Sequence, residues 1–343
     1  MAKYKIAVIE GDGTGPEVIG CAVRVLEAAE LDAEFIPIEA GYWAFQKFGK
    51  QVTDSAWEII GESNCVLKGP TTTPMGGGES QMKSVAVTLR QKLDLYANVR
   101  PCKSRPGVPV PTKFTNLDFV IVRENTEGLY KGIEYKMSED EVVSLRVFTR
   151  RGCERISRFG FELARRDKRK KVTLITKANI LQVTDGFFTN IFNKVAEGYP
   201  ELEHEDIYVD RANMYMITNP VYFDVIVTSN LFGDVLSDAA AGLIGGLGLA
   251  PGANMGDNFA MFEAVHGSAP KYAGQKKVNP TAMILSSVMM LRYLGESTIA
   301  EKVEKAVNRV LLEGATNKKI VTYDLDGTAT NDQMTDEIIK RLE

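Results

Sequence analysis

The chain has 343 residues, of which 44% are hydrophobic and 25% are charged, and its formal net charge is −4. This composition is typical of a soluble protein long enough for two domains or one large α/β unit. The charge gives no electrostatic reason to expect a nucleic acid or an anionic membrane as partner. No apolar run approaches the length of a membrane span, and the first residues indicate a strand rather than a signal peptide.

Cysteine and histidine usage excludes further classes of site. The four cysteines are widely spaced, without a CxxC pair, and indicate buried thiols in a reduced cytoplasmic setting rather than disulfides or a zinc site. With two histidines in the whole chain, His204 and His266, a histidine-based hydrolase or metal site has little material.

The N-terminal segment predicts a strand, a tight turn and a helix. Residues 4–9 form a β-branched run, and alternating glycines at 11, 13 and 15 permit a turn that other residues could not make cheaply. Pro16 suits a first helical position, and apolar residues then recur at helical spacing. The glycine order lacks the last step of G-x-G-x-x-G, so a structural turn is at least as well supported as a phosphate cradle.

The next elements are a strand over 33–39, a helix around Trp43 and Phe45, and a strand at 65–67. The strand runs into residues 68–78, a loop of one lysine with threonines, prolines and glycines. Such a loop allows close approach to a polar ligand. A flexible surface loop is the alternative, but threonines between prolines argue against it.

Three arginines lie near the ends of predicted elements. Arg90 ends a helix-like segment, Arg100 precedes Pro101, and Arg123 ends a strand over 119–123. Each could be a surface charge, but guanidinium groups also bind small carboxylates with two parallel hydrogen bonds. An anionic substrate is a reasonable hypothesis.

Further along the chain, residues 142–149 predict an exposed strand pair or arm, and 153–166 predict a helix. The basic cluster at its end has no interleaved aromatic residues and is interpreted as a solvated helix end. Predicted strands over 172–175 and 207–209 then deliver Lys177 and Asp210. Alone, Lys177 fits a surface position as well as a functional one.

Asp234 and Asp238 follow a buried strand over 225–227. If a helix begins near Gly233, they lie one turn apart on one face. Carboxylates so placed repel each other unless a cation or proton lies between them, and an oxygen-only pair suits Mg²⁺ or Mn²⁺. In the alternative, one Asp caps the helix and the other is solvated. This segment by itself favours the alternative.

After a glycine-rich stretch at 245–254, two apolar helices are predicted over 281–294 and 299–312, in the core or at an interface. Strands and helices alternate throughout, which predicts an α/β architecture with a mixed sheet.

Taken together, several motifs resemble the isocitrate/isopropylmalate dehydrogenase family of β-decarboxylating dehydrogenases. The resemblance runs from Ile6 to the C-terminus. It is carried by GDGTGPE, LKGPTTTP, LRQKLDLYANVRP, VIVRENTEGLY, TKANI, YVD, NLFGDVLSD, GLAPGANMGD and EAVHGSAPKYAG. It implies a two-domain fold with a mixed twisted sheet, not a Rossmann fold. A large coenzyme-binding domain would comprise residues 1–97 and 250–343. A small domain, 98–249, would carry the metal-site residues and a dimerisation arm at about 131–150.

The resemblance also implies roles for named residues. Asp234 and Asp238, with Asp210 of a dimer partner, would hold Mg²⁺ or Mn²⁺; Lys177 of the partner would help remove the hydroxyl proton, and Tyr130 would protonate the enolate left after CO₂ departs. The substrate would be bound by Ser84, Arg90, Arg100, Arg123, Tyr130, Lys177 and Asn179. The coenzyme would be bound by Thr72, Glu263, His266, Gly267, Lys271, Tyr272, Asn279 and Tyr323.

The choice of substrate and coenzyme is predicted from positions at which members of the family differ. Ser84 matches a serine of isocitrate enzymes, whereas Ala86 matches neither their asparagine nor the leucine expected for isopropylmalate, and Val87 is not the arginine of some homoisocitrate enzymes. Isocitrate is therefore expected first, homoisocitrate second and isopropylmalate third. Lys271 and Tyr272 offer a charge and a hydroxyl to a 2′-phosphate, which favours NADP over NAD. Gly327 lacks the arginine typical of NADP enzymes, so the preference could be weakened or dual.

We therefore expect a cytoplasmic homodimer with shared active sites that acts on a tricarboxylate, without a nucleic-acid or membrane partner. A non-catalytic regulatory subunit is the alternative from another class. Such subunits typically lose catalytic residues, and the chain keeps Tyr130, Lys177, Asp210, Asp234 and Asp238.

Overall fold

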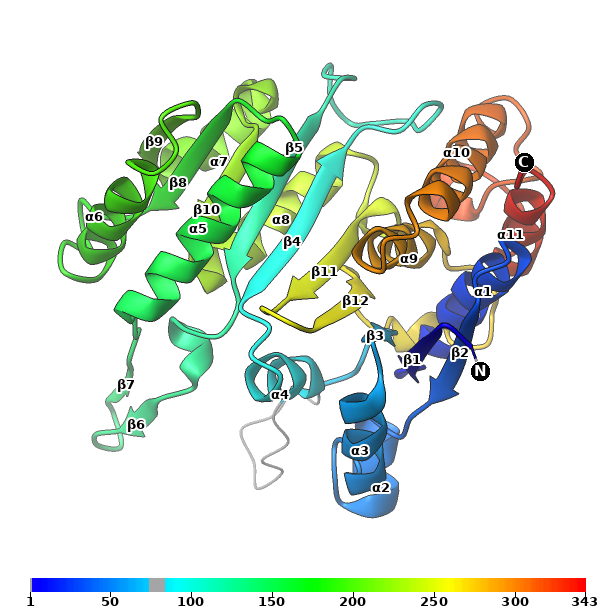
Figure 1. Cartoon of the computed structure of the whole chain (residues 1–343), viewed down its shortest axis with the longest axis horizontal. Coiled ribbons are helices and arrows are strands. Elements are labelled where there is room, and N and C mark those ends of the chain that lie inside the picture. The colour runs from blue at the N-terminus through cyan, green and yellow to red at the C-terminus, as the bar shows by residue number, and fades with distance from the viewer. Residues whose placement is uncertain (1, 74–83) are drawn as a thin grey trace.

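In the computed structural model, which describes residues 2–73 and 84–343, ten strands form one mixed sheet (Figure 1). Its strand order is β2-β1-β3-β12-β11-β4-β5-β10-β8-β9. Neighbouring strands are parallel in both outer parts of the sheet. In the middle, β11 and β4 pair antiparallel with each other and with their outer neighbours β12 and β5. The predicted α/β architecture with a mixed sheet is confirmed.

The strands of the large sheet are short and mostly buried. Their bounds are β1 Tyr4–Ile9, β2 Ala33–Pro37, β3 Cys65–Lys68, β4 Ala97–Lys103, β5 Asp118–Glu124, β8 Lys171–Thr176, β9 Glu203–Tyr208, β10 Val225–Thr228, β11 Pro251–Met255 and β12 Ala260–Ala264. A separate hairpin pairs β6 Glu134–Lys136 with β7 Val142–Ser144. This exposed hairpin overlaps the exposed strand pair or arm predicted over 142–149, and Figure 1 shows it projecting from the end of α5. A role of this arm in dimerisation stays a prediction.

The helices lie on both faces of the sheet (Figure 1). Their bounds are α1 Gly15–Ala28, α2 Tyr42–Phe48, α3 Asp54–Glu62, α4 Val85–Lys92, α5 Arg150–Arg166, α6 Thr184–Ala196, α7 Val209–Thr218, α8 Asn230–Leu243, α9 Thr281–Tyr293, α10 Ser297–Gly314 and α11 Asn331–Ile339. The glycine-rich stretch is not a continuous helix: a single 3₁₀ turn at Leu247–Leu249 leads into β11.

Helix α8 differs from its prediction at its start. It begins at Asn230, three residues before the expected Gly233, because β10 ends at Thr228 and Ser229 alone separates the two elements. Ser229 is the N-cap residue. Neither Asp234 nor Asp238 caps the helix, so that alternative interpretation was wrong.

The glycine turn after β1 is a structural joint. Gly11 has φ of 81°, and a Cβ there would come within 2.2 Å of the carbonyl oxygen of Pro70. The carboxylate of Asp12 accepts hydrogen bonds from the backbone N–H groups of Thr72, at 2.8 Å, and Tyr42, at 3.0 Å. The turn therefore fixes the loop after β3, whose predicted glycine-rich end at 74–78 lies outside the described residues.

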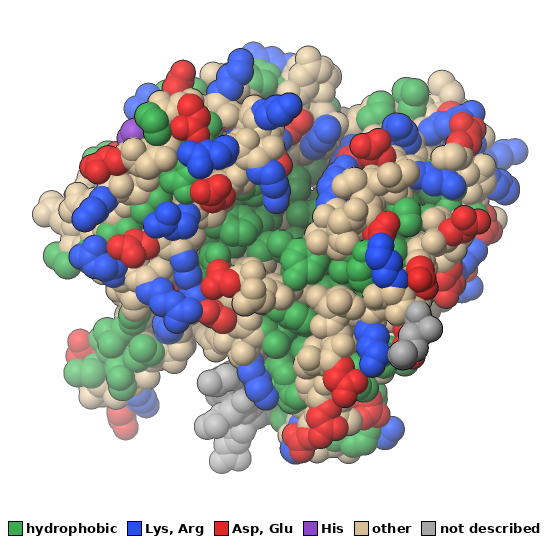
Figure 2. Space-filling model, viewed as in Figure 1, with side chains coloured by type: hydrophobic (Ala, Val, Ile, Leu, Met, Phe, Trp, Pro, Cys, Tyr) green, Lys and Arg blue, Asp and Glu red, His purple; other side chains and the backbone are tan. Residues whose placement is uncertain are grey.

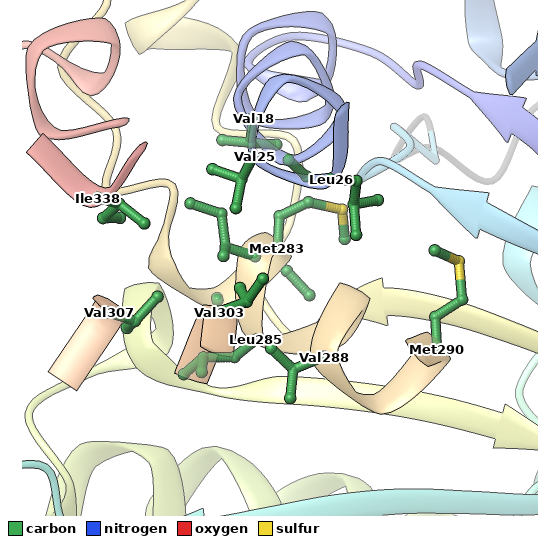
Figure 3. Close-up of a cluster of buried hydrophobic side chains, with 14 of the residues drawn as sticks. Val18, Val25, Leu26, Met283, Leu285, Val288, Met290, Val303, Val307 and Ile338 are labelled. Atoms are coloured by element: carbon green, nitrogen blue, oxygen red, sulfur yellow. The ribbon is translucent and has the colours of Figure 1, made fainter. Parts of the chain in front are cut away.

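Among the residues that the structure describes, buried apolar side chains form four clusters, and the largest lies between the sheet and the terminal helices. Figure 3 shows Val25 of α1, Met283 of α9, Val303 of α10 and Ile338 of α11 meeting in this cluster. Chain segments from opposite ends of the sequence are thereby held in one core.

The clusters divide along the chain much as the two predicted domains do. Two draw on residues 6–95 and 249–338, and the other two draw on residues 96–250. The division into domains stays a proposal, because the sheet runs unbroken through both parts.

A groove separates α5 from α9 and α10 on one face of the sheet. Figure 2 shows hydrophobic side chains gathered at its base, which includes Val99, Val120, Met255 and Phe262, and its volume is about 750 Å³. Among the helices that the structure describes, none has both the length and the apolar character needed to cross a membrane.

Candidate active site

A buried cluster of charged side chains joins the ends of β3 and β12. Residues Glu263 and Lys68 are register partners on these parallel strands, and the ammonium group of Lys68 lies 2.7 Å from Oε2 of Glu263. Nη2 of Arg90, from α4, lies 2.7 Å from the other carboxylate oxygen. Burial alone would raise the pKa of Glu263, but the two cations outweigh it and hold that pKa far below its ordinary value. The predicted substrate arginine and coenzyme residue are thus direct partners.

A row of asparagines connects this cluster to the second predicted arginine. Asn254 donates to Oε1 of Glu263 at 2.8 Å and accepts a hydrogen bond from Asn98 at 2.7 Å. The side-chain oxygen of Asn98 accepts a hydrogen bond from Nε of Arg100 at 2.7 Å. The strand register explains the row, because Asn98 lies opposite Asn254 on β11 and opposite Arg123 on β5, which places all three on one face of the sheet.

The third arginine binds the helix that carries the paired aspartates. Arg123, on β5, forms an ion pair with Asp234 and donates to the side-chain oxygen of Asn230. The hydroxyl of Tyr130 donates to Oδ2 of Asp234 at 2.6 Å. Arg100 lies 3.5 Å from Asp234 and 3.7 Å from Asp238. The predicted tyrosine, two arginines and two aspartates therefore meet at one place.

The electrostatics of this group separate the two carboxyls. Burial opposes ionisation of Asp234, but Arg123, the Tyr130 hydroxyl and Arg100 outweigh it, and the pKa of Asp234 falls below its ordinary value. Burial raises the pKa of Asp238, and Arg100 does not offset it. Burial and the hydrogen bond to Asp234 raise the pKa of Tyr130, so its hydroxyl keeps its proton at neutral pH. Burial lowers the pKa of Arg123 to about 10, which still leaves it charged.

Two predicted site residues lie apart from this group within the chain. Lys177 follows β8, Asp210 lies in the first turn of α7, and the two form an ion pair with each other. No hydrogen bond or ion pair in residues 2–73 and 84–343 joins either side chain to Asp234 or Asp238. Asn179, two residues beyond Lys177, is exposed. One chain therefore supplies two separate halves of the predicted metal and proton-transfer site.

The two aspartates provide the type of ligand atom that a divalent cation prefers, but they are too few to hold it by themselves. Asp234 and Asp238 offer hard oxygen donors on one helix face. Within the described residues, no three His, Cys, Asp or Glu side chains lie close enough together to hold a metal ion. The residues fit a metal ion if further oxygen ligands come from substrate and from a second chain.

A cavity of about 150 Å³ opens beside the buried cluster. Its walls include the predicted substrate residues Ser84, Arg90 and Arg100, together with Ala86 and His266. Two buried nitrogen atoms of these residues, Nε of Arg90 and Nε2 of His266, have no hydrogen-bond partner among the described atoms. Burial lowers the pKa of His266, which favours the neutral imidazole. Unpaired buried polar atoms are what a polar ligand would satisfy: Nε of Arg90 can donate a hydrogen bond, and Nε2 of a neutral His266 can accept one, because Nδ1 faces the carbonyl oxygen of Gly267.

The predicted coenzyme residues gather along one edge of this cavity and beyond it. Thr72 shares a hydrogen bond of 2.7 Å with Ser268, and the neighbouring Gly267 lines the cavity. Asn279 is buried, donates to Asp324 at 2.9 Å and accepts from the backbone N–H of Thr281. The amide nitrogen and the oxygen of its side chain therefore each have a partner within the protein.

Lys271, Tyr272 and Tyr323 form a small exposed group farther out. The two rings lie 5.9 Å apart between centroids, and Nζ of Lys271 lies 4.8 Å from the Tyr272 ring. A hydrogen bond with Tyr323 and the charge of Lys271 lower the pKa of Tyr272. An anion placed here would meet one cation and two hydroxyl groups.

The structure also explains the departure at Gly327. A Cβ there would come within 1.9 Å of the carbonyl oxygen of Val321, which no side chain could tolerate without a backbone shift. The arginine expected at this position from NADP enzymes cannot be accommodated by the present backbone.

Sequence reasoning missed the residues that hold the predicted ones in place. Asn98 and Asn254 were not singled out, because their joint role depends on strand register. Lys68 was seen as a loop lysine, although it is buried beside Glu263. A polar residue inside an apolar strand is the one signal that could have drawn attention to them.

Comparisons with known proteins agree with the fold. Residues 5–342 match the model of the isocitrate/isopropylmalate dehydrogenase family. A 3-isopropylmalate/3-methylmalate dehydrogenase from Methanocaldococcus jannaschii is 51% identical over 343 residues, with 99% of each chain covered. An isocitrate/homoisocitrate dehydrogenase from Thermus thermophilus is 46% identical over 339 residues, covering 99% of this chain and 98% of that enzyme. The crystal structure of isocitrate dehydrogenase from Methylococcus capsulatus matches with a TM-score of 0.93 and 48% identity, over 99% of both chains.

The chain belongs to the isocitrate/isopropylmalate dehydrogenase family. This is a family of decarboxylating dehydrogenases that use NAD or NADP and a divalent metal ion. The predicted family and fold class are confirmed. The names of the relatives differ in substrate at similar identity, so they leave the particular acid open.

Proposed function

We propose that this protein oxidises isocitrate to 2-oxoglutarate and CO₂, with NADP as hydride acceptor and Mg²⁺ or Mn²⁺ as metal. The observation that carries the proposal is the convergence of Arg90, Arg100 and Arg123, all buried, with Asp234 and Tyr130. Arg90 and Arg100 line the cavity, and Arg123 pairs with Asp234. Three buried guanidinium groups in this region suit a substrate with several carboxylates.

Each residue has a distinct part in this scheme. The arginines would hold the carboxylates of the substrate and so fix its orientation in the cavity. Lys177 of a second chain takes the proton from the C2 hydroxyl as hydride leaves C2. When bound, the metal ion polarises the oxygen at C2 and so assists loss of the β-carboxylate as CO₂. The hydroxyl of Tyr130 then protonates the enolate carbon, consistent with a raised pKa that keeps its proton available.

The choice of isocitrate rests on the wall of the cavity. Ser84 can donate a hydrogen bond to a third carboxylate, and Ala86 leaves space beside it. A homoisocitrate carboxylate lies one methylene farther from the reacting carbon. Homoisocitrate is therefore the next candidate, and it is the second substrate in the name of the Thermus thermophilus relative.

A specific observation favours 3-isopropylmalate as a second candidate function. The relative from Methanocaldococcus jannaschii, at 51% identity, is named for that activity. In addition, Ala86 gives the cavity an apolar wall beside Ser84. An isopropyl group would find apolar contacts there, but Ser84 would gain no polar partner from it.

Lys271, Tyr272 and Tyr323 support NADP as the coenzyme. They would offer charge and hydroxyl groups to the 2′-phosphate. Gly327 withholds a further contact, so we expect a moderate preference with NAD as the weaker alternative. His266 and Arg90 fit a bound ligand because each buries an unpaired nitrogen beside the cavity.

A homodimer would complete the site. Exposed apolar side chains occur on the elements that carry the predicted site residues: Ile180 and Val183 follow β8 and Lys177, Val235 is next to Asp234 on α8, and Ile217 and Val221 lie at the far end of α7 from Asp210. Exposed apolar residues near incomplete sites are typical of an interface between chains. A cytoplasmic location remains a prediction.

One set of assays tests the function. The purified protein is assayed with isocitrate, homoisocitrate and 3-isopropylmalate, each with NAD and NADP, with and without EDTA. We expect the highest kcat/KM for isocitrate with NADP, and loss of turnover in EDTA. Highest kcat/KM for another acid would reassign the substrate. Absence of turnover with every acid would favour a non-catalytic regulatory subunit.

A further inference from the structure

A buried ion pair lies between the two halves of the proposed site. Asp185, in the first turn of α6, is 1% exposed, and its carboxylate pairs with Arg146. Its other oxygen accepts a hydrogen bond from the backbone N–H of Lys177 at 2.6 Å. Asp185 therefore holds the backbone of the residue proposed to remove the substrate proton.

Arg146 carries the connection to the helix of the paired aspartates. Nη2 of Arg146 donates to the side-chain oxygen of Ser229, the N-cap residue of α8, at 2.9 Å. The guanidinium group also lies 4.9 Å from the ring centroid of Phe232, in the first turn of α8. The same group lies 4.6 Å from the ring of Phe148, at the base of the arm.

The hydrogen bonds of Asp185 and Arg146 connect two elements that carry proposed active-site residues. A buried ion pair is weak support for stability, because removing two charges from water costs about as much as their attraction returns. Here the bonds reach the Lys177 backbone and the start of α8, and Phe148 and Phe232 cover the guanidinium. The pair thus sets the position of one element relative to the other.

We propose that Asp185 is a positioning residue for proton removal by Lys177, and that Arg146 anchors it to the N-terminus of α8. This inference rests on the proposed function. In the proposed dimer, Lys177 acts on the substrate bound by the partner, whereas α8 binds the metal ion of its own chain. Asp185 and Arg146 would therefore connect one active site to the other.

The test uses the full-length enzyme and the variants Asp185→Asn and Arg146→Lys. Steady-state kinetics are measured with isocitrate and with isocitrate deuterated at C2. If Lys177 is displaced, oxidation at C2 becomes slower and limits turnover more. We expect kcat of Asp185→Asn to fall about tenfold to a hundredfold with KM little changed, and the deuterium isotope effect on kcat to rise. Arg146→Lys keeps a cation and should retain more activity.

The isotope effect separates positioning from a loss of folded protein. A destabilised variant lowers the active fraction but leaves the isotope effect of the remaining enzyme unchanged. Arg105→Gln is the control, because Arg105 forms a partly buried ion pair with Glu304 at 2.6 Å in another part of the chain. It should keep the wild-type isotope effect even if its unfolding temperature drops.

The outcomes distinguish this inference from the proposed function. If the wild-type enzyme turns over isocitrate and Asp185→Asn has the same kcat and isotope effect, the positioning role of Asp185 is wrong, but the proposed function stands. A fall in kcat with an unchanged isotope effect would also overturn it. Absence of isocitrate turnover in the wild type would overturn the proposed function, and with it this role of Asp185.

Discussion

Gly233 of α8 lies directly against Arg123 of β5. A Cβ at position 233 would come within 2.6 Å of both Cβ and Cγ of Arg123, closer than carbon atoms can pack. The missing side chain therefore lets the helix approach the arginine closely enough for the ion pair between Arg123 and Asp234. Steric exclusion by Arg123 therefore explains why position 233, in the motif NLFGDVLSD, is a glycine.

Replacing this glycine should damage the site. We expect Gly233→Ala to push α8 away from Arg123, raise KM for the substrate at least about tenfold and lower stability by about 1–3 kcal/mol. Gly242→Ala is the control on the same helix, because a Cβ there meets no atom within 4 Å. Kinetics and thermal unfolding of both variants check this prediction. Equal KM values would show that the close contact is unimportant for substrate binding.

Coenzyme choice should depend on the exposed group beyond the cavity. Replacing Lys271 by Asp and Tyr272 by Ile removes a cation and a hydroxyl and adds a negative charge that repels a 2′-phosphate. The ratio of kcat/KM for NADP to that for NAD should fall at least about tenfold. An unchanged ratio would exclude these residues from phosphate recognition.

The Gly327 contact gives a companion prediction. Gly327→Arg should not strengthen NADP binding, because its Cβ would collide with the Val321 carbonyl oxygen and force the local backbone to move. Reduced stability without a gain in NADP affinity is expected. Tighter NADP binding with wild-type stability would mean that the backbone adapts readily.

Glu304 should make stability depend on acid pH. Burial opposes its ionisation, but hydrogen bonds and charges from Arg105 and Arg292 hold its pKa at about 2, below the ordinary 4.5. Because the folded-state pKa is the lower one, the ionised form stabilises the fold above pH 4.5, and this contribution is lost as the pH falls toward 2.

We expect Glu304→Gln to lower the free energy of unfolding by about 1–3 kcal/mol at pH 7, with the difference from wild type shrinking below pH 4.5. Urea unfolding at several pH values measures it. Glu301→Gln, an exposed change of equal charge on the same helix, should have little effect at any pH. A pH-independent difference for Glu304→Gln would contradict the assignment.

Much of the architecture follows from the sequence, and the reasons for the failures are physical. Apolar runs and helical spacing were sufficient to predict a mixed α/β protein and most of its elements. The start of α8 was misplaced because Gly233 looked like a helix boundary, whereas its role is the close contact with Arg123.

Within the site, local pattern revealed the charged residues but not their partners. The row from Glu263 through Asn254 and Asn98 to Arg100 depends on the register of three strands, which sequence spacing does not determine. Likewise, Arg146 and Asp185 are far apart in the chain and meet only after folding. Neither stood out as a charged residue within its own helix or arm.

The central claim is that each active site combines the aspartates of one chain with Lys177 of another. Asp234→Asn should remove metal-dependent turnover in a folded dimer, and Lys177→Met should remove proton transfer. Mixing the two inactive variants under conditions of subunit exchange would create hybrid dimers with one intact site.

Measurement of isocitrate oxidation in this mixture tests the claim most directly. With random exchange, half of the dimers are hybrids and each has one working site, so about a quarter of wild-type activity should return. Activity no greater than that of the separate variants, in a mixture shown to contain hybrid dimers, would contradict a shared site.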